Sequence, residues 1–220
     1  ESSIFIAQKK STVQRGSFLS LFSSGDRFKR FMICILIGLP TYYVVGLPIK
    51  FAFNFGKALN IPDVSVPIAM ITFYIAMSVG DLICNAISQA IKSRKKMFFF
   101  YNTFNLCAIL LFTYYPPSNA WQYHFIYCPL LGLSVGYWAL IVTTAAEMFG
   151  TNLRATVTTS VPNFIRSSFI IIAIGFTALE SSIGTIHAGG LIGLVCSLIA
   201  LAATAMLQET FGRDLNFEEH

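Results

Sequence analysis

The sequence predicts an all-α membrane protein with six transmembrane helices. Its composition is the first reason: 55% of the 220 residues are hydrophobic, 11% are charged, and the mean hydropathy is +0.67. A soluble domain usually carries about 25% charged residues. The second reason is six separate apolar runs, each close to the roughly 20 residues that a helix needs to cross a bilayer. The runs cover residues 31–55, 66–91, 97–115, 124–148, 155–179 and 186–207.

These runs define one transmembrane domain, residues 31–207, between a polar segment and a short tail. Residues 1–30 are basic and rich in serine, and we interpret them as a cytoplasmic linker. Within them, SFLSLFSS (residues 17–24) is either a plain loop or a short helix lying on the membrane surface. Residues 208–220 form a cytoplasmic tail. Because the chain begins at Glu1 without a methionine or a leader pattern, we expect it to be a piece of a longer protein.

The first run contains helix breakers in the stretch GLPTYYVVGLPIKF, residues 38–51. Glycine and proline both weaken a helix interior. We therefore expect this helix to bend or hinge at these residues, which are Gly38, Pro40, Gly46 and Pro48. Between them, Tyr42 and Tyr43 can offer hydroxyl groups to a solute or simply pack. Lys50 lies near the outer end, where it can extend to water or serve a solute.

Charges inside the later runs are costly in hydrocarbon and are candidates for function. Arg166 lies about 16 Å into the fifth run at 1.5 Å per residue, close to the bilayer midplane, and Asn163 is one turn earlier. Asp81 lies about 15 Å from the end of the second run. Each is either a solute or coupling group or half of a structural pair. In the fourth run, the stretch GLSVGYWAL adds the candidates Tyr137 and Trp138.

Orientation follows from the basic residues in the loops, which favour the cytoplasmic side. One side of the predicted membrane carries twelve lysines and arginines, and the opposite loops carry only Lys57. This asymmetry predicts a multi-pass protein of the cytoplasmic (inner) membrane with both termini in the cytoplasm. The twelve are Lys9, Lys10, Arg15, Arg27, Lys29, Arg30, Lys92, Arg94, Lys95, Lys96, Arg154 and Arg213.

The sequence lacks the motifs that are typical of several other functional classes. The chain has no GxxxxGK[ST] phosphate loop, no run of regularly spaced arginines for voltage sensing and no TVGYG filter. Its five cysteines lie in apolar runs without CxxC spacing, and its histidines do not group with other metal ligands. We therefore expect no enzyme activity, no cofactor, no metal and no nucleic-acid partner.

The first and fourth runs both contain breakers, and they occupy equivalent places if the chain is two three-helix repeats, residues 31–115 and 124–207. Three spans per repeat would give the repeats opposite orientations in the membrane. Transporters often place the solute near the midplane, where interrupted helices free backbone groups to meet it. The pattern is therefore typical of a transporter.

Four loop motifs resemble those of the major facilitator superfamily, above all its sugar porters and metabolite–proton symporters. AAEMFGTNLRATV (residues 145–157) resembles the E-x-F-P-T-x-x-R-A segment between helices ten and eleven. LQETFGRDLNFEE (residues 207–219) is similar to the P-E-T-K-G-R-x-L ending, with Gln208 for proline and Phe211 for lysine. ESSIF (residues 1–5) resembles the E-S/T-P-x-F stretch after helix six.

The fourth motif, GDLICNAISQAIKSRKK (residues 80–96), stands where the family has G-x-x-x-D-R-x-G-R-R/K. Ser88 and the basic run remain, whereas Gln89 and Ala90 replace the family aspartate and arginine and one residue is added. The loop therefore lacks two of the charged residues that form the gating salt bridge in the family.

The resemblance covers the whole chain as the C-terminal half of a twelve-helix transporter, helices seven to twelve, and implies a missing N-terminal six-helix half. It places Glu147 and Arg154, with Arg94 and Lys95 of the basic run, in the charge network that closes the cytoplasmic gate; the alternative is that Glu147 and Arg154 are a solvated loop pair. It also places the helices of Asp81 and Arg166 on opposite flanks, so it implies no direct bridge between these two residues.

We therefore expect a secondary active transporter that moves a small polar organic solute by alternating access, coupled to protons. The solute could be a sugar, an organic acid or a zwitterion. Two other classes stay open: a six-span permease subunit driven by a separate ATPase, and a non-transporting membrane scaffold or receptor. The short loops argue against the former, and the midplane arginine would lack a purpose in the latter.

Overall fold

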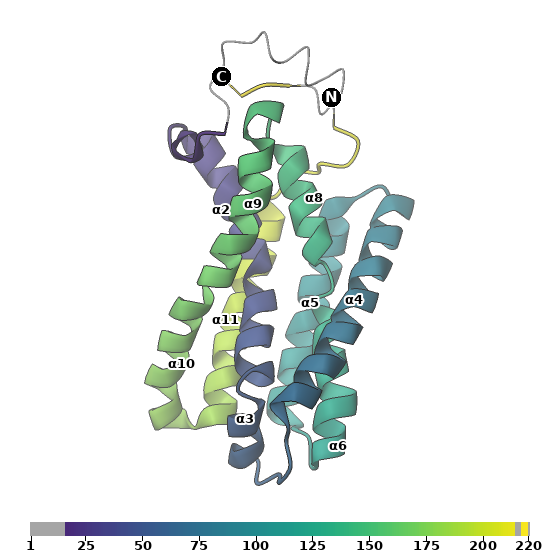
Figure 1. Ribbon diagram of the computed structural model, residues 1–220, viewed down its shortest axis with the longest axis vertical. Coiled ribbons are helices and arrows are strands. Elements are labelled where there is room, and N and C mark those ends of the chain that lie inside the picture. The colour runs from purple at the N-terminus through teal and green to yellow at the C-terminus, as the bar shows by residue number, and fades with distance from the viewer. Residues whose placement is uncertain (1–15, 214–216, 220) are drawn as a thin grey trace.

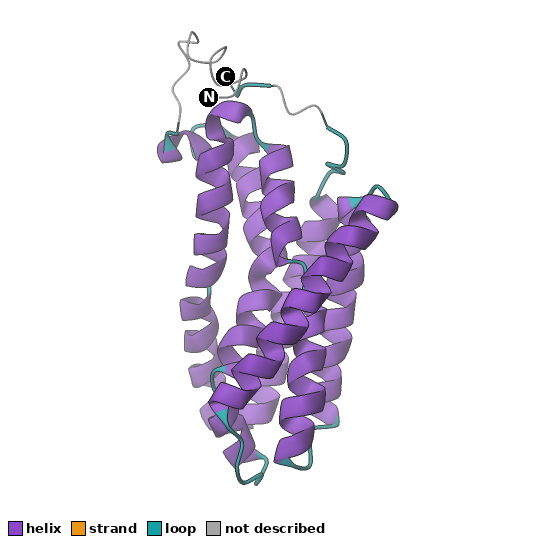
Figure 2. Cartoon of the chain, turned by 45° about the vertical axis from the view of Figure 1, so that its right-hand side comes forward, coloured by secondary structure: helices purple, strands orange, loops and turns teal. Residues whose placement is uncertain are grey.

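The computed structural model describes residues 16–213 and 217–219. The ESSIF stretch, Lys9, Lys10 and Arg15 lie outside the described residues, as do residues 214–216 and 220 of the tail. The described part contains helices and no strand (Figures 1 and 2). In chain order these are η1 (Phe18–Leu21), α2 (Gly25–Val44), η2 (Val45–Ile49), α3 (Ala52–Ala58), α4 (Val66–Ala90), α5 (Arg94–Tyr114), α6 (Ala120–Gln122), η3 (Tyr123–Tyr127), α7 (Cys128–Ser134), α8 (Trp138–Met148), α9 (Thr151–Ser167), α10 (Phe169–Ile183) and α11 (Thr185–Met206).

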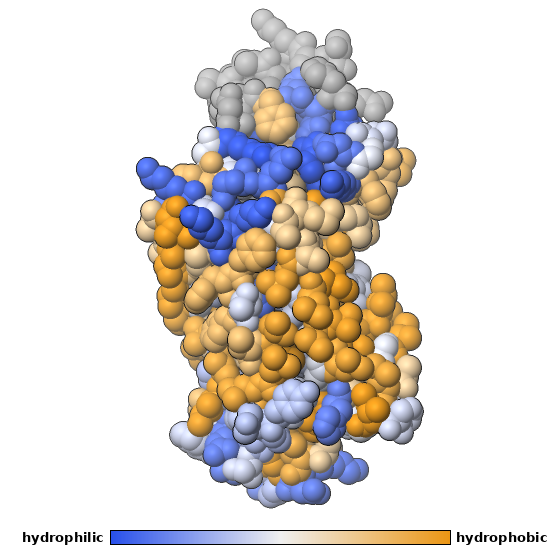
Figure 3. Space-filling model, turned by 180° about the vertical axis from the view of Figure 1, so that it is seen from behind, coloured by the Kyte–Doolittle hydropathy of each residue, from blue (hydrophilic) through white to orange (hydrophobic). Residues whose placement is uncertain are grey.

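Six helical segments of this chain are long and apolar enough to cross a membrane, as the sequence predicts. They are Gly25–Ile49, Val66–Ala90, Arg94–Tyr114, Ala120–Met148, Thr151–Ile183 and Thr185–Met206. On the face shown in Figure 3, hydrophobic residues form a broad band across the middle, and hydrophilic residues gather at both ends. The molecule is therefore built as a multi-pass membrane protein. We call the end where α2 begins and α11 ends the tail end.

The fifth span is longer than the predicted residues 155–179, because α9 begins directly after Gly150 and α10 follows α9 after a single turn residue, Ser168. The segment SFLSLFSS contains one turn of 3-10 helix, η1, at the tail end.

The first span changes its helical geometry only at the second Gly-Leu-Pro. α2 continues through Pro40, whereas Val45–Ile49 form a π-helical turn that contains Pro48. The backbone N–H of Lys50 reaches back to the carbonyl of Val45 at 3.1 Å, the wider spacing of a π turn. The first span is therefore regular at Pro40 and changes to a π turn at Pro48, and bending at these residues stays a prediction.

The predicted hinge glycines are positions of close packing. A Cβ atom at Gly38 would lie 2.4 Å from the Ile165 side chain, and one at Gly46 would lie 1.9 Å from the Phe169 ring. Both glycines let the fifth span approach the first.

The fourth span is also interrupted, as the stretch GLSVGYWAL suggests. α7 ends at Ser134 and α8 starts at Trp138, so Val135–Tyr137 lie outside both helices. Gly136 makes this break possible beside α4: a Cβ on it would lie 2.6 Å from the Cα of Gly80 and 2.8 Å from the backbone nitrogen of Asp81. Backbone atoms cannot move aside as a flexible side chain can. The break and α4 therefore contact each other backbone to backbone.

Hydroxyl groups connect the spans within the buried interior. Tyr43 donates to the carbonyl of Gly189 at 2.8 Å, and Tyr123 donates to the carbonyl of Pro48 at 2.6 Å. Tyr137 contacts the carbonyl of Ile37 and the side-chain oxygen of Asn102, both at 3.1 Å. In an apolar environment such bonds satisfy groups that would otherwise be costly to bury. They fix the helices around the two interruptions.

We predict that Gly136→Ala destabilises the fold, because overpacking against backbone costs about 1–3 kcal/mol. Thermal unfolding of the purified protein in detergent measures the effect. Gly25→Ala is the control, because a Cβ there meets nothing within 4 Å. Equal unfolding temperatures for the two variants would contradict the close approach of the break to α4.

Candidate functional site

A cavity of about 340 Å³ lies beside the two interrupted spans. Residues of four spans line it: the first through α2 and η2, the second through α4, the fourth through α8 and the fifth through α9. It combines one cation, one carboxylate, aromatic rings and hydroxyl groups. We call it the central pocket, and its lining residues are Thr41, Tyr42, Val45, Tyr74, Met77, Ser78, Asp81, Trp138 and Arg166.

Arg166 is held at the pocket by an aromatic side chain of the first span. Its Nε donates to the hydroxyl oxygen of Tyr42 at 2.9 Å, and its guanidinium carbon lies 6.0 Å from the centre of the Tyr42 ring. The Tyr42 ring in turn packs 5.7 Å from the ring of Trp138. Arg166 is exposed, and its other N–H groups, which can all donate, have no hydrogen-bond partner among the described residues.

Asp81 closes the other side of the pocket at the start of α8. Its Oδ1 accepts the backbone N–H of Ala139 at 3.0 Å, and Asn85 contributes a longer side-chain contact of 3.4 Å. The N-terminus of a helix attracts negative charge because its first N–H groups lack partners within the helix. Asp81 thus satisfies the backbone that the break in the fourth span exposes.

The pocket therefore brings Asp81 and Arg166 to one site, although the family resemblance places their helices on opposite flanks. No ion pair joins the two side chains in the part of the chain that the structure describes. The opposite charges face a common space, which suits a ligand that carries both kinds of polar group.

Four predicted solute residues do not line the central pocket. Tyr43 and Tyr137 are buried and bonded to other helices. Asn163 donates to the carbonyl of Thr159 in its own helix. Lys50 is exposed, and its ammonium lies 5.9 Å from the centre of the Phe169 ring.

Sequence reasoning did not identify the pocket residues on α4 other than Asp81. Tyr74, Met77 and Ser78 precede Asp81 by seven, four and three residues, which puts them on the same face of a helix. That spacing around a charged residue is the signal that could have found them. Thr41 is next to Tyr42 in the sequence, but that position alone does not show that it lines the pocket. The orientation of α2 in the structure is needed as well.

A second cluster of charges lies at the tail end and contains Arg94 and Glu147, two of the four predicted gate residues. Arg94 binds Glu147 through Nη2 and Oε1 at 2.9 Å and through Nε at 3.3 Å. The side chains are 5% and 13% exposed, so this pair is largely shielded from water. Arg94 also donates to the hydroxyl of Ser88 at 2.9 Å. The pair joins the start of α5 to the end of α8.

Arg154 and Lys95, the other two predicted gate residues, lie at the same end of the bundle and bind backbone carbonyls. Arg154 donates from Nε to the carbonyl of Ala146 at 2.9 Å, across the turn between α8 and α9. Lys95 donates to the carbonyl of Ala205 at 2.8 Å, near the end of α11. Glu147 thus has its ion pair with Arg94 of the basic run, and Arg154 binds backbone carbonyls around the turn.

The tail after α11 adds Glu209, which sequence reasoning left out, to this cluster. Its carboxylate accepts the hydroxyl of Ser93 and the backbone N–H of Arg94, the latter at 2.9 Å, at the N-terminus of α5. The neighbouring Thr210 hydroxyl donates to Glu147 at 2.7 Å. Partial burial raises the pKa of Glu209, but the bonds from Ser93 and from backbone N–H groups outweigh it and lower the pKa to about 2.

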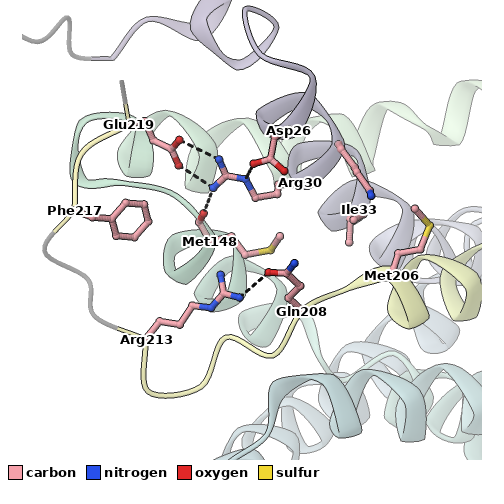
Figure 4. Close-up of a pocket in the computed structure, with 10 residues that line it drawn as sticks. Asp26, Arg30, Ile33, Met148, Met206, Gln208, Arg213, Phe217 and Glu219 are labelled. Carbon is pink, nitrogen blue, oxygen red and sulfur yellow. Dashed lines mark hydrogen bonds and ion pairs between the residues drawn. The ribbon is translucent and has the colours of Figure 1, made fainter.

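Glu219 makes a similar clamp further along the tail (Figure 4). Its two oxygens bind Nη1 and Nη2 of Arg30 at 2.8 and 3.0 Å, and Arg27 lies 3.4 Å away. The Glu219 backbone exchanges hydrogen bonds of 3.0 Å with the side chain of Asn152. Burial opposes ionisation, yet the Arg30 guanidinium lowers the pKa of this carboxyl. The tail thereby contacts the starts of α2 and α9.

No family model and no curated protein sequence matches this chain. The resemblance to major facilitator transporters therefore rests on the loop motifs. Among residues 16–213 and 217–219, no three His, Cys, Asp or Glu side chains form a group that could hold a metal ion.

We predict that acid releases the tail through Glu209. The usual pKa is 4.5 and the folded value is about 2, so the unfolded chain takes up this proton first as pH falls. The ionised Glu209 carboxylate therefore stabilises the folded state fully above pH 4.5, and this stabilisation is lost as the pH falls through about 2. Unfolding temperatures in detergent between pH 2 and 7 should show this loss, and Glu209→Gln should reduce it. Identical pH profiles for the two proteins would contradict the role of this carboxylate.

Proposed function

We propose that this chain is one half of a secondary active transporter that moves a small polar organic solute by alternating access. The observation that carries the proposal is the central pocket, where Arg166, Asp81 and an aromatic pair meet beside two interrupted spans. Charged side chains within membrane spans and broken helices are expensive in a membrane and are typical of solute pathways.

The chemistry of the pocket restricts the class of solute. The guanidinium of Arg166 donates hydrogen bonds and suits a carboxylate or hydroxyl groups. The rings of Tyr42 and Trp138 offer an apolar surface, and Asp81 accepts hydrogen bonds or binds a cationic group. A sugar, an organic acid and a zwitterion each match part of this set.

Asp81 is the proposed carrier of the coupling proton. In its ionised form it accepts the N–H of Ala139 and holds the start of α8 against α4. Protonation would remove the charge that favours this bond. The contact between the second and fourth spans would then weaken, so proton uptake and movement of α8 would be coupled.

The tail-end cluster is the proposed cytoplasmic gate. Arg94, Glu147 and Glu209 connect α5, α8 and the tail through shielded charge-assisted bonds. Opening this side requires these bonds to break together. The proposal includes the orientation that the basic loops favour, with both termini in the cytoplasm.

The loop motifs favour membership of the major facilitator superfamily, with these spans as helices seven to twelve in two inverted repeats. The interruptions in the first and fourth spans agree with that arrangement. An N-terminal six-helix half would then cover the open side of the central pocket.

Uptake into sealed vesicles that contain the protein together with its N-terminal half tests the function. The probes are radiolabelled sugars, organic acids and zwitterions, with and without an imposed pH gradient. We expect a member of this panel to accumulate in response to the gradient. Lack of any response to the gradient, with uptake present, would contradict proton coupling.

Arg166→Ala should abolish that uptake while membrane insertion is unchanged, because the pocket loses its cation. Asn163→Ala is the matched control: it lies one turn away on α9, is exposed, and does not line the pocket. Uptake by Asn163→Ala should stay near the wild-type rate. Equal uptake by the Arg166 variant and the wild type would exclude the central pocket as the solute site.

A further inference from the structure

We infer that the tail end carries a binding site for one anionic phospholipid, between α2, α11 and the tail. The inference concerns the membrane-facing surface and does not depend on the transported solute. It starts from three neighbouring cavities that share residues and change from polar to apolar along the span.

The polar cavity has a volume of about 300 Å³ and lies at the start of α2 (Figure 4). Three basic side chains line it, namely Lys29, Arg30 and Arg213, together with two carboxylates, Asp26 and Glu219. Arg30 is paired with both carboxylates. Lys29 and Arg213 form no ion pair within the described residues. Arg27 also binds Glu219 from outside the cavity, at 3.4 Å, so Arg27 and Arg30 balance the two carboxylates and the charges of Lys29 and Arg213 are left for a ligand.

The contacts of Arg213 place its charge at this cavity without neutralising it. Its Nε donates to the carbonyl of Glu209 at 3.0 Å, and its Nη2 donates to the side-chain oxygen of Gln208 at 3.1 Å. Both acceptors are uncharged. The guanidinium is thus positioned, and it retains its charge for an anion such as a phosphodiester.

An apolar groove of about 410 Å³ continues from the polar cavity, and the two share Lys29, Ile33 and Met206. The groove runs between α2 and α11. A lysine at such a junction can lay its methylene groups on the apolar wall and keep its ammonium in the polar region. This is the arrangement that a lipid needs at the boundary between headgroup and acyl chain.

A second apolar groove of about 540 Å³ extends the first and shares Met32, Leu36 and Ile199 with it. It is lined by α2, by α9 and α10, and by α11. From Lys29 to Leu39 the combined groove follows α2 for about 15 Å at 1.5 Å per residue. That length matches one leaflet of a hydrocarbon core about 30 Å thick.

Charge and shape together select the occupant. The apolar groove takes acyl chains, and the two unpaired cations favour a headgroup with net negative charge. On the side of the membrane that the basic loops favour, anionic lipids are the abundant ligands with both features. A zwitterionic lipid would fill the groove equally well but would gain less from Lys29 and Arg213.

Native mass spectrometry of the purified chain in detergent tests this site. The probes are phosphatidylglycerol and phosphatidylcholine with identical acyl chains. We expect one phosphatidylglycerol to bind at least tenfold more tightly than phosphatidylcholine. Equal affinity for the two lipids would overturn the proposal.

Two variants locate the binding. Lys29→Gln should weaken phosphatidylglycerol binding about fivefold, the effect of one basic residue near an anionic surface, and the double variant with Arg213→Gln should weaken it further. Lys96→Gln is the matched control, an exposed lysine at the same end that lines none of the three cavities. Equal losses in the Lys29 and Lys96 variants would mean general surface attraction and would overturn the site.

The acyl chain is tested separately. Ala202→Trp places a large ring on an exposed groove position of α11 and should reduce the affinity for phosphatidylglycerol. Glycerol 3-phosphate, which has the charge without the chains, should displace the lipid only at far higher concentration. If it competes as well as the lipid does, the cavity is a site for a free anion and the phospholipid proposal is wrong.

Discussion

The structure depends on the backbone contact between Gly80 of α4 and Gly136 in the break of the fourth span. A break exposes backbone N–H groups, and within hydrocarbon each unsatisfied group costs several kcal/mol. Here the contact brings Asp81, the residue after Gly80, to the free N–H of Ala139. The carboxylate therefore has a structural duty at the same point where it lines the central pocket. In the proposed transport cycle, this double role links proton binding to helix movement.

α8 connects the two polar regions of the molecule. Trp138 at its start packs on Tyr42 in the central pocket, and Glu147 near its end pairs with Arg94 at the tail end. Nine residues separate them, about 13.5 Å along a helix. Because a helix moves largely as a rigid element, displacement at the pocket would strain the ion pair. The tail stabilises the same end at two points: Glu209 binds the start of α5, and Glu219 binds Arg30 of α2. The polar groups thus concentrate where a transport cycle would need bonds that form and break.

Hydropathy predicts the six spans well, because length and apolar composition are local properties of the chain. A charged residue inside an apolar run is also a local feature of the sequence, so Asp81 and Arg166 could be predicted as candidate site residues. Pairing between distant elements is a different matter. Tyr43 and Tyr137 resemble Tyr42 in the sequence, yet they bond to Gly189 and Ile37 in the interior. Glu147 pairs with Arg94, 53 positions away at the start of α5, whereas proximity in the sequence favours a pair with Arg154. The partner of each side chain depends on how the helices pack against one another, and a single sequence does not show that packing.

Solvent access to the central pocket tests alternating access most directly. Ser78 is exposed and lines the pocket, so Ser78→Cys in a background without the five native cysteines provides a single thiol for labelling. The measurement is its reaction with a membrane-impermeant thiol reagent, added to either side of the membrane in the protein's own membrane. Alternating access predicts labelling from both sides, with a pH gradient shifting the ratio between them. Labelling from one side only, at every pH, would contradict it.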